Sequence, residues 1–339
     1  MSNVKRAPAS TPATWHLKDP STWNFAQRSI VLLDIIQDPA GSARPPVHAK
    51  EDKVPVYPVW RQHAFVLPRA LPPLLIHWAL MRYARITLHP AAAVVFYAAS
   101  FLTFGVSLFK MLRRMGKHYG FFDGTSERDG VPDTHGWKVA LSLLGVITVR
   151  PIFAAFAAYD RYEMPSVTWK TPIDICAFCM ILDFWFYWYH RSMHEISWLW
   201  PLHRLHHTTK HPNATLGAYA DVFQEWGDIL FIPLLTWLVL PVDFTTWYLT
   251  TCYLLYTEAS GHSGIRLYWG VPTTFFLRYF GVGMELCLED HDNHHLRGYR
   301  SSGNYGKQTR MWDTYFGTAR PRGESKESNL DWDHPAVTL

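Results

Sequence analysis

The sequence predicts an all-α integral membrane protein, with a few transmembrane or half-inserted helices and a cytosolic cap rich in histidine. Long apolar runs, a high aromatic content and three histidine-rich windows near the ends of such runs lead to this prediction. Of the 339 residues, 48% are apolar and 16% are aromatic, and Trp and Tyr are enriched where proteins meet lipid headgroups. The mean hydropathy of −0.08 indicates a few spans joined to a sizeable polar body.

The first half of the chain contains three apolar segments after a polar, mostly irregular arm at residues 1–55. Residues 58–83 are broken by prolines and arginines, which indicates an interfacial or re-entrant segment. Residues 91–109 form an uncharged run of 19, long enough to span the hydrocarbon layer. Residues 139–159 are interrupted by Arg150 and Pro151, so we expect a kinked or half-inserted helix there.

The second half carries an aromatic helix at 175–189 and a helical hairpin at 229–257 that enters and leaves the bilayer. Residues 271–280 are short and amphipathic, as expected of a segment that lies in the membrane interface, and the tail after 320 is expected to be polar and loose. We therefore divide the chain into a polar arm (1–55), membrane and interfacial helices (56–170), a histidine-rich domain (171–320) and a polar tail (321–339).

The charge distribution favours a membrane over nucleic acid as the partner. The net charge is +4, but the basic residues form no compact patch, so no nucleic-acid partner is expected. The cluster from Lys110 to Lys117 directly follows an apolar run, as expected of a cytoplasmic flank. The four cysteines suggest no disulfide framework, and the pair Cys176 and Cys179 lies in an apolar helical run, where packing is the expected role.

Eight of the 18 histidines lie in three windows of five residues. The windows are His190-x-x-x-His194, His203-x-x-His206-His207 and His291-x-x-His294-His295. On a helix, residues i, i+3 and i+4 share one face, so each window can direct its imidazoles toward one point. The first two windows follow the 175–189 helix and the third follows the hairpin, so all three can face the same side of the membrane.

A metal centre explains this pattern better than packed or capping histidines do, because three such windows and the isolated His262 occur together. Imidazole is the commonest metal ligand and suits zinc, iron, copper and nickel. A single zinc ion normally takes four ligands, and eight or nine histidines exceed that number. The pattern therefore predicts two metal ions.

At its histidine-rich part the sequence resembles the fatty acid hydroxylase/sterol desaturase superfamily of membrane di-iron enzymes. The resemblance covers about residues 175–318 and rests on "DFWFYWYHRSMH", "HRLHHTTKHPN" and "HDNHHLRGYRSSGNYGKQTRMWDTYFGT". The last segment is the most specific, because it joins a histidine window to Asn304-Tyr-Gly306 and to the Trp312-Asp313 and Phe316-Gly-Thr318 elements typical of the family. Relatives include sterol C4-methyl oxidases, sterol C5-desaturases and fatty acyl or sphingoid hydroxylases.

The resemblance implies that residues 171–320 form the catalytic domain and that the histidines bind two iron ions. The implied ligands are His190, His194, His203, His206, His207, His262, His291, His294 and His295. His211 is open between ligand, supporting residue and plain surface residue. Catalytic residues other than the metal centre itself are not identified. Asp183, Asp228, Asp292 and Asp313 are candidates to orient the imidazoles, although each is also explained as a helix cap or a solvated charge.

The implied reaction is the O₂-dependent hydroxylation, methyl oxidation or desaturation of a lipid, sterol or terpenoid-like substrate, since an unactivated C–H bond requires a redox metal. Electrons are expected from NAD(P)H through a separate carrier such as cytochrome b5 with its reductase, and the endoplasmic reticulum is the expected membrane. Either a docking surface for this carrier or contacts with anionic lipid headgroups would explain five basic residues: Lys110, Arg113, Arg114, Lys307 and Arg310.

Two other functions remain possible from the sequence. A zinc-dependent membrane hydrolase would use the same histidines without O₂ or a reductant, and metal analysis separates it from an oxygenase. A non-catalytic metal- or sterol-binding membrane protein is the other alternative, although a binding module has no need for eight coordinating positions.

Overall fold

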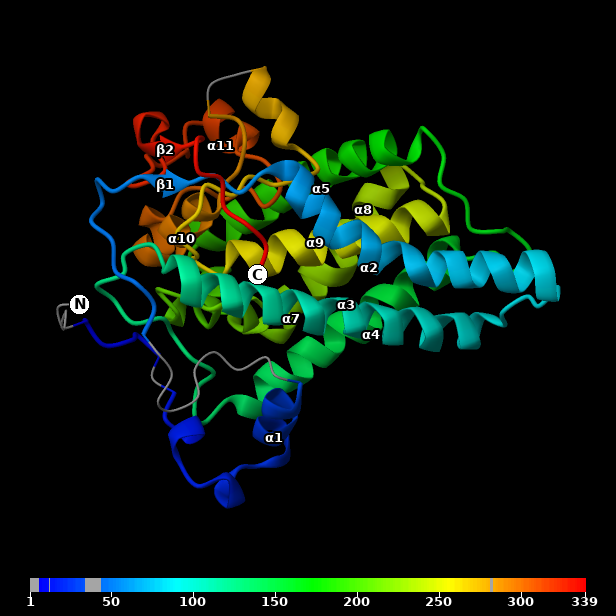
Figure 1. The fold of residues 1–339 in the computed structure, drawn as a ribbon, viewed down its shortest axis with the longest axis horizontal. Helices are drawn as coiled ribbons and strands as arrows, with labels where there is room; N and C mark the ends of the chain where they lie inside the picture. The colour runs from blue at the N-terminus through cyan, green and yellow to red at the C-terminus, as the bar shows by residue number, and fades with distance from the viewer. Residues whose placement is uncertain (1–5, 12, 34–43, 281–282) are drawn as a thin grey trace.

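The computed structural model describes residues 6–11, 13–33, 44–280 and 283–339. This part of the chain is mainly helical, and its strands are limited to β1 (Val54–Pro55) and β2 (Leu330–Asp331), which pair in parallel. In Figure 1 the turn between helices α2 and α3 lies at one end of the molecule, and α10 and the strand pair lie toward the other. The mainly helical architecture that the sequence predicts is confirmed.

Five helical stretches are long and apolar enough to cross a membrane. They comprise α2 with its π-helical extension (Val59–Ala84), α3 (Pro90–Tyr119), α4 (Gly136–Ala158), α5 (Thr171–Glu195) and the stretch Val222–Val239. The last stretch contains α7 (Val222–Trp226), a π-helical turn (Gly227–Phe231) and α8 (Ile232–Val239). Large apolar side chains on these helices, such as Val95, Leu144 and Phe156, are exposed, which suits contact with lipid. The chain is an integral membrane protein.

Two of these helices are more continuous than the sequence indicated. Residues 58–83 were expected to be interfacial or re-entrant, yet α2 is continuous through three internal prolines; membrane helices tolerate proline where neighbouring groups satisfy the freed backbone. Residues 139–159 were expected to form a kinked or half-inserted helix; α4 runs through Pro151 as one helix, and a kink or partial insertion stays a prediction. Arg150 within α4 is buried and pairs with Glu258 of α9 at 2.6 Å, so its charge is neutralised inside the bundle.

The hairpin expected at 229–257 is present, but its second arm is a core helix. The two arms are α8 and α9 (Phe244–Gly261), and Asp243 caps α9 by accepting a hydrogen bond from the backbone N–H of Thr246. Nearly every residue of α9 is buried, and the helix packs against α2, α3, α4 and α5. The chain therefore folds its membrane helices around α9, which ends at His262 beside the histidine windows.

The two ends of the chain are more ordered than expected. In the N-terminal arm, α1 (Phe25–Leu32) begins with a reciprocal capping box between Asn24 and Gln27 and packs against α4. The tail, expected to be loose, is fixed to the body: Glu324 pairs with Arg266 at 2.6 Å, and β2 pairs with β1. These contacts fix the position of the tail although its composition is polar.

Short elements complete the part that carries the histidines. They are α6 (Trp200–Arg204), the 3-10 turns at His206–Thr208, Ala214–Ala218 and Tyr299–Ser301, α10 (Leu288–Arg297) and α11 (Met311–Tyr315). Within residues 271–280 the structure forms the 3-10 turn Phe275–Tyr279. The location of that turn in a membrane interface stays a prediction.

Candidate metal centre

The first histidine window lies in the last turns of α5. His190 and His194 are four residues apart and therefore share a face, and both are buried. The second window begins in α6 and continues into the 3-10 turn His206–Thr208, so the chain bends between His203 and His206. This bend lets neighbouring histidines of one window point to two different places.

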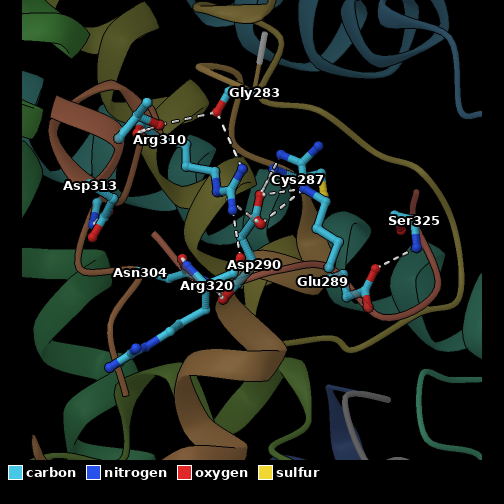
Figure 2. A network of polar contacts seen from close by, with 12 residues as sticks. Gly283, Cys287, Glu289, Asp290, Asn304, Arg310, Asp313, Arg320 and Ser325 are labelled. Carbon is cyan, nitrogen blue, oxygen red and sulfur yellow. Dashed lines mark hydrogen bonds and ion pairs between the residues drawn. The ribbon is translucent and has the colours of Figure 1, made fainter. Parts of the chain in front are cut away.

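The third window lies on α10, whose position is fixed by a buried polar network (Figure 2). Asp290 accepts from the backbone N–H of Cys287 at the start of the helix, and it forms an ion pair with Arg322 at 2.7 Å. Although burial opposes ionisation, Arg322 keeps the pKa of Asp290 below its usual value. Gly298 ends the helix at a φ of 62°, a conformation that favours glycine.

The nine sequence-predicted histidines come together in two adjacent groups. The group of five contains His190, His194, His203, His207 and His294, and the group of four contains His206, His262, His291 and His295. In each group the nearest ring nitrogens all lie within 4.8 Å of one another. The groups are neighbours, because the rings of His207 and His295 stack with centroids 4.7 Å apart. The second and third windows each contribute to both groups.

The Nδ1 atoms of most of these histidines point outward to hydrogen-bond acceptors. Five of them donate to main-chain carbonyl oxygens. The donor and acceptor residues are His190 and Tyr305, His194 and Tyr299, His206 and Tyr219, His294 and Gly303, and His295 and Thr209. His203 donates to Oε1 of Gln224, and His262 donates to the carbonyl of Glu258 one turn earlier. Because a carbonyl oxygen only accepts, each of these rings carries its proton on Nδ1.

The Nε2 atoms point inward, and their arrangement fits metal ions. His190 and His203 face each other with Nε2 atoms 3.0 Å apart, and His206 and His262 do so at 3.2 Å. With the protons on Nδ1, these are lone pairs facing one another, which repel unless a cation lies among them. Within the described residues, Nε2 of His194 and of His295 has no hydrogen-bond partner. Neutral imidazoles with converging lone pairs are the donor set that a metal ion requires.

Burial favours the neutral form of these rings. It holds the pKa values of His203, His206, His207, His291, His294 and His295 well below the usual value for imidazole, and the neighbouring imidazoles lower most of them further. Burial also lowers the pKa of His262, to about 4. The site is therefore ready to bind a cation near neutral pH without first losing protons.

His211 is not part of either group. It is buried, and its Nε2 lies 3.6 Å from Asp123, while its backbone N–H donates to Asp129. Of the three possibilities left open by the sequence, a role in supporting the loop fits these contacts.

The four aspartates considered as orienting groups do not accept directly from the histidines. Asp183 instead accepts from the backbone of Lys307, Gln308 and Thr309, and Asp313 accepts from the backbone of Tyr305 and Gly306. Together they hold the loop whose Tyr305 carbonyl orients His190. Asp292 pairs with Arg128, and Asp228 lines a cavity. The direct acceptors are carbonyls and Gln224, which the histidine spacing gave no means to identify.

A cavity lies against the histidines and has mostly apolar walls. His190, His203, His206, His262 and His291 line one side of it, and residues of α3, α4, α9 and the Val222–Val239 stretch line much of the rest. Lys307 also lines the cavity and pairs with Glu258 at 2.6 Å, while Arg310 lies 3.4 Å from Asp290. The suggestion that Lys307 and Arg310 form a docking surface is therefore wrong, since buried carboxylates hold both side chains inward. In the sequence, only Arg150 within the apolar run 139–159 pointed to charged residues in this cavity.

Comparisons with known proteins agree with this site. The family model described as fatty acid hydroxylase matches residues 175–318. The chain is 37% identical to the fatty acid hydroxylase vlmA of Lecanicillium sp over 311 residues, which cover 84% of each chain. It is 32% identical to methylsterol monooxygenase 2-2 of Arabidopsis thaliana over 50% of this chain and 60% of that protein. It is also 25% identical to alkylglycerol monooxygenase of Xenopus tropicalis, over 53% of this chain and 38% of that protein.

No solved structure matches the chain. The match to vlmA extends well beyond the histidine windows and includes most of the membrane helices. On this similarity, and on the family model that covers all three windows, the chain belongs to the fatty acid hydroxylase family.

Proposed function

We propose that the protein is a membrane-bound, O₂-dependent di-iron oxidoreductase that hydroxylates, oxidises a methyl group of, or desaturates a lipid-like substrate. The observation that carries this proposal is the set of nine histidines whose Nε2 atoms converge in two groups beside an apolar cavity. The relatives named as fatty acid hydroxylase, methylsterol monooxygenase and alkylglycerol monooxygenase support the same class of reaction. We assign the catalytic domain to residues 171–320 and the preceding membrane helices to 56–170.

Each histidine group would hold one iron ion, and bound iron would supply the O₂ activation that an unactivated C–H bond requires. In a hydroxylation one oxygen atom of O₂ enters the substrate, and the other leaves as water after taking up two electrons and two protons. The chain's own residues fix the geometry: the carbonyls and Gln224 hold the rings in one orientation, and burial excludes bulk water. Substrate pose in the cavity then decides between hydroxylation and desaturation.

Metal analysis of purified protein tests the two-iron proposal. We expect two iron atoms per chain, and we expect His206→Ala and His294→Ala each to lower the iron content and abolish turnover, since they remove ligands from different groups. His211→Ala should retain both irons, since His211 lies outside both groups. One zinc and no iron, with activity retained under anaerobic conditions, would falsify the oxygenase and favour the membrane hydrolase. Lipid profiling of a host with and without the gene then identifies the substrate.

The electrons would come from NAD(P)H through a separate carrier, cytochrome b5 or a similar protein. A surface beside the histidines suits such a carrier. The ring of Trp200 lies 5.4 Å from that of His194 and 4.4 Å from that of Tyr299, measured between centroids. Three exposed arginines belong to the same segments: Arg204 lies one turn after Trp200 on α6, Arg300 lies over the Tyr299 ring at 5.5 Å, and Arg297 is in the last turn of α10. We call these three arginines with Trp200 the Trp200 face, and we propose it as the docking site for an acidic carrier.

The histidine windows would then face the cytosol, and the membrane would be that of the endoplasmic reticulum. The support is the basic cluster that begins at Lys110, near the end of α3, together with the need for a cytosolic reductant. Cysteines introduced at the exposed positions Ser197 and Ser301 should both react with a membrane-impermeant maleimide from the cytosolic side. Labelling of the two positions from opposite sides would contradict a shared site.

A further inference from the structure

Five charged side chains line the cavity next to the histidines. One of them, Glu225, pairs with Lys138 at 3.6 Å, and the other four form a cluster. Arg150 comes from α4, Asp228 from the π-helical turn after α7, Glu258 from α9 and Lys307 from the loop after Tyr305. Nη2 of Arg150 lies 2.6 and 2.7 Å from the two oxygens of Glu258, and Nζ of Lys307 lies 2.6 Å from Oε1. Asp228 interacts electrostatically with the other three charges, and its carboxylate also accepts a hydrogen bond from the side chain of Gln224. We call these four residues the charged cluster.

The charged cluster has more hydrogen-bonding capacity than its internal contacts use. Arg150 is only 6% exposed, yet among the described residues its Nε and Nη1 have no partner, and neither does Oδ1 of Asp228. Buried donors and acceptors without partners cost about 1–3 kcal/mol each. If the ion pair served only to neutralise Arg150, its unpaired nitrogens and the unpaired oxygen of Asp228 would only destabilise the fold. Their position indicates a ligand that completes them.

The chemistry of that ligand follows from the charge balance. Arg150 and Lys307 contribute two positive charges, and Asp228 and Glu258 contribute two negative ones, so the charged cluster is neutral as it stands. A carboxylate added to it would bring an uncompensated buried charge close to Asp228, which is costly. A hydroxyl or amide group instead accepts from Arg150 and donates to Asp228 while remaining neutral. The cluster thus fits an uncharged polar group that both donates and accepts.

The charged cluster lies close to the metal-binding histidines. Nζ of Lys307 is 4.5 Å from the centroid of the Phe186 ring, and that ring is 5.1 Å from the ring of His190. On the other side, the carbonyl of Glu258 accepts from Nδ1 of His262 at 2.7 Å. Phe109, Leu143 and Val146 give the same cavity an apolar wall. A lipid whose polar group binds the cluster would therefore expose carbons near that group to the metal centre.

From these observations we infer that Arg150 and Asp228 form a specificity subsite for a neutral polar group, a hydroxyl or an amide, near one end of a lipid substrate. Oxidation then occurs a few carbons from the polar group and not at the far end of the chain. This inference rests on the proposed oxidation of lipids and names the class of lipid that the site accepts.

Four probes of equal chain length test the inference with the iron-loaded protein and its reductant system: hexadecane, 1-hexadecanol, hexadecanamide and hexadecanoate. We expect the alcohol and the amide to be oxidised with kcat/KM at least roughly tenfold above the alkane and the carboxylate, the size of one buried hydrogen bond. Mass spectrometry of the products should place the new oxygen in the half of the chain nearer the polar group.

Two variants test whether the charged cluster causes the preference among these probes. Asp228→Asn changes the sum of the four charges from zero to +1, so the carboxylate probe should gain roughly tenfold in kcat/KM relative to the alcohol. Arg150→Met should reduce the preference for the alcohol over the alkane to near one. Arg69→Met is the matched control, since Arg69 lies on another membrane helix and bonds Ser107 and Phe65 outside the cavity. Iron content and thermal unfolding of every variant report whether it is folded.

Equal turnover of the alkane and the alcohol by wild type would overturn the inference, as would oxidation at the far end of the chain. It would also be overturned if a folded Asp228→Asn kept the wild-type ratio of carboxylate to alcohol turnover; this variant decides the matter alone if Arg150→Met does not fold. An iron-loaded wild type that changes host lipids yet oxidises none of the polar probes would leave the proposed function standing and refute only the subsite.

Discussion

Most histidines of the proposed metal centre are oriented by main-chain carbonyls, which leave no signature in the sequence. Main-chain carbonyls of Tyr305, Tyr299 and Gly303 fix three of the rings. The grouping of the histidines could be predicted from the sequence, because i, i+3 and i+4 spacing depends only on helix geometry. The acceptors could not, because a carbonyl reaches a histidine only after distant segments have packed together.

Within the part of the chain that the structure describes, Gln224 is the side chain that accepts a hydrogen bond from a predicted ligand, so its role can be tested by substitution. It bonds Nδ1 of His203 at 2.8 Å, and loss of such an acceptor typically lowers metal affinity or activity 10- to 100-fold. We therefore expect Gln224→Leu to lower iron occupancy or turnover by roughly that factor. Iron analysis and turnover measure this effect. Gln62→Leu, a change at a buried glutamine that bonds Gly270 instead, should leave iron unchanged; an equal loss there would show a general packing effect.

At the scale of elements, the metal centre depends on how α10 is held. The helix carries three of the nine histidines, and Figure 2 shows Asp290 at its start among basic side chains. Arg322, which closes this network, lies in the segment that was expected to form a loose polar tail. Polar composition suggested disorder there, but the sequence did not show that buried carboxylates of α10 would bind this segment.

Neutralising Asp290 should therefore loosen α10 and weaken the metal centre. Asp290→Asn leaves Arg322 without one of its buried partners, although the ion pair of Arg322 with Glu285 remains. Removing one partner of a buried ion pair costs about 3–5 kcal/mol, so we expect the free energy of unfolding to fall by about 3 kcal/mol. Chemical unfolding in detergent, followed by iron analysis, measures both effects. Asp331→Asn, which alters a carboxylate paired with the exposed His334, should leave the free energy of unfolding nearly unchanged, because exposed ion pairs contribute little.

For the whole molecule, the helical membrane architecture was predictable and the arrangement of its charges was not. Apolar length identified the 91–109 span, because a bilayer requires such a length. The same reasoning treated Arg150 as an interruption of its run, whereas the structure buries it against Glu258, 108 residues further along the chain. From charge alone, Lys307 and Arg310 were candidates for a docking surface or for contacts with lipid headgroups, whereas both pair with carboxylates inside the protein. Tertiary packing decides which charges face a partner.

The exposed arginines of the Trp200 face are therefore the ones expected to act on the electron carrier. Replacing Arg204, Arg297 and Arg300 together by Glu should lower kcat/KM for cytochrome b5 by roughly tenfold or more at low ionic strength, with iron content unchanged, because complementary charge acts mainly on association rate. The defect should shrink as salt screens these exposed charges, and single-turnover oxidation after chemical reduction should match wild type.

A double variant at Arg113 and Arg114, near the end of α3, is the matched comparison. From the sequence alone, these two arginines could contact either the carrier or lipid headgroups. If the Trp200 face is the docking site, Arg113→Glu with Arg114→Glu should leave the rate with cytochrome b5 within about twofold of wild type. A larger loss there, with the triple variant unaffected, would move the docking site to the end of α3. If the triple variant instead weakens binding to anionic vesicles and leaves the carrier rate unchanged, the three arginines face lipid headgroups, and electrons reach the histidines from another side.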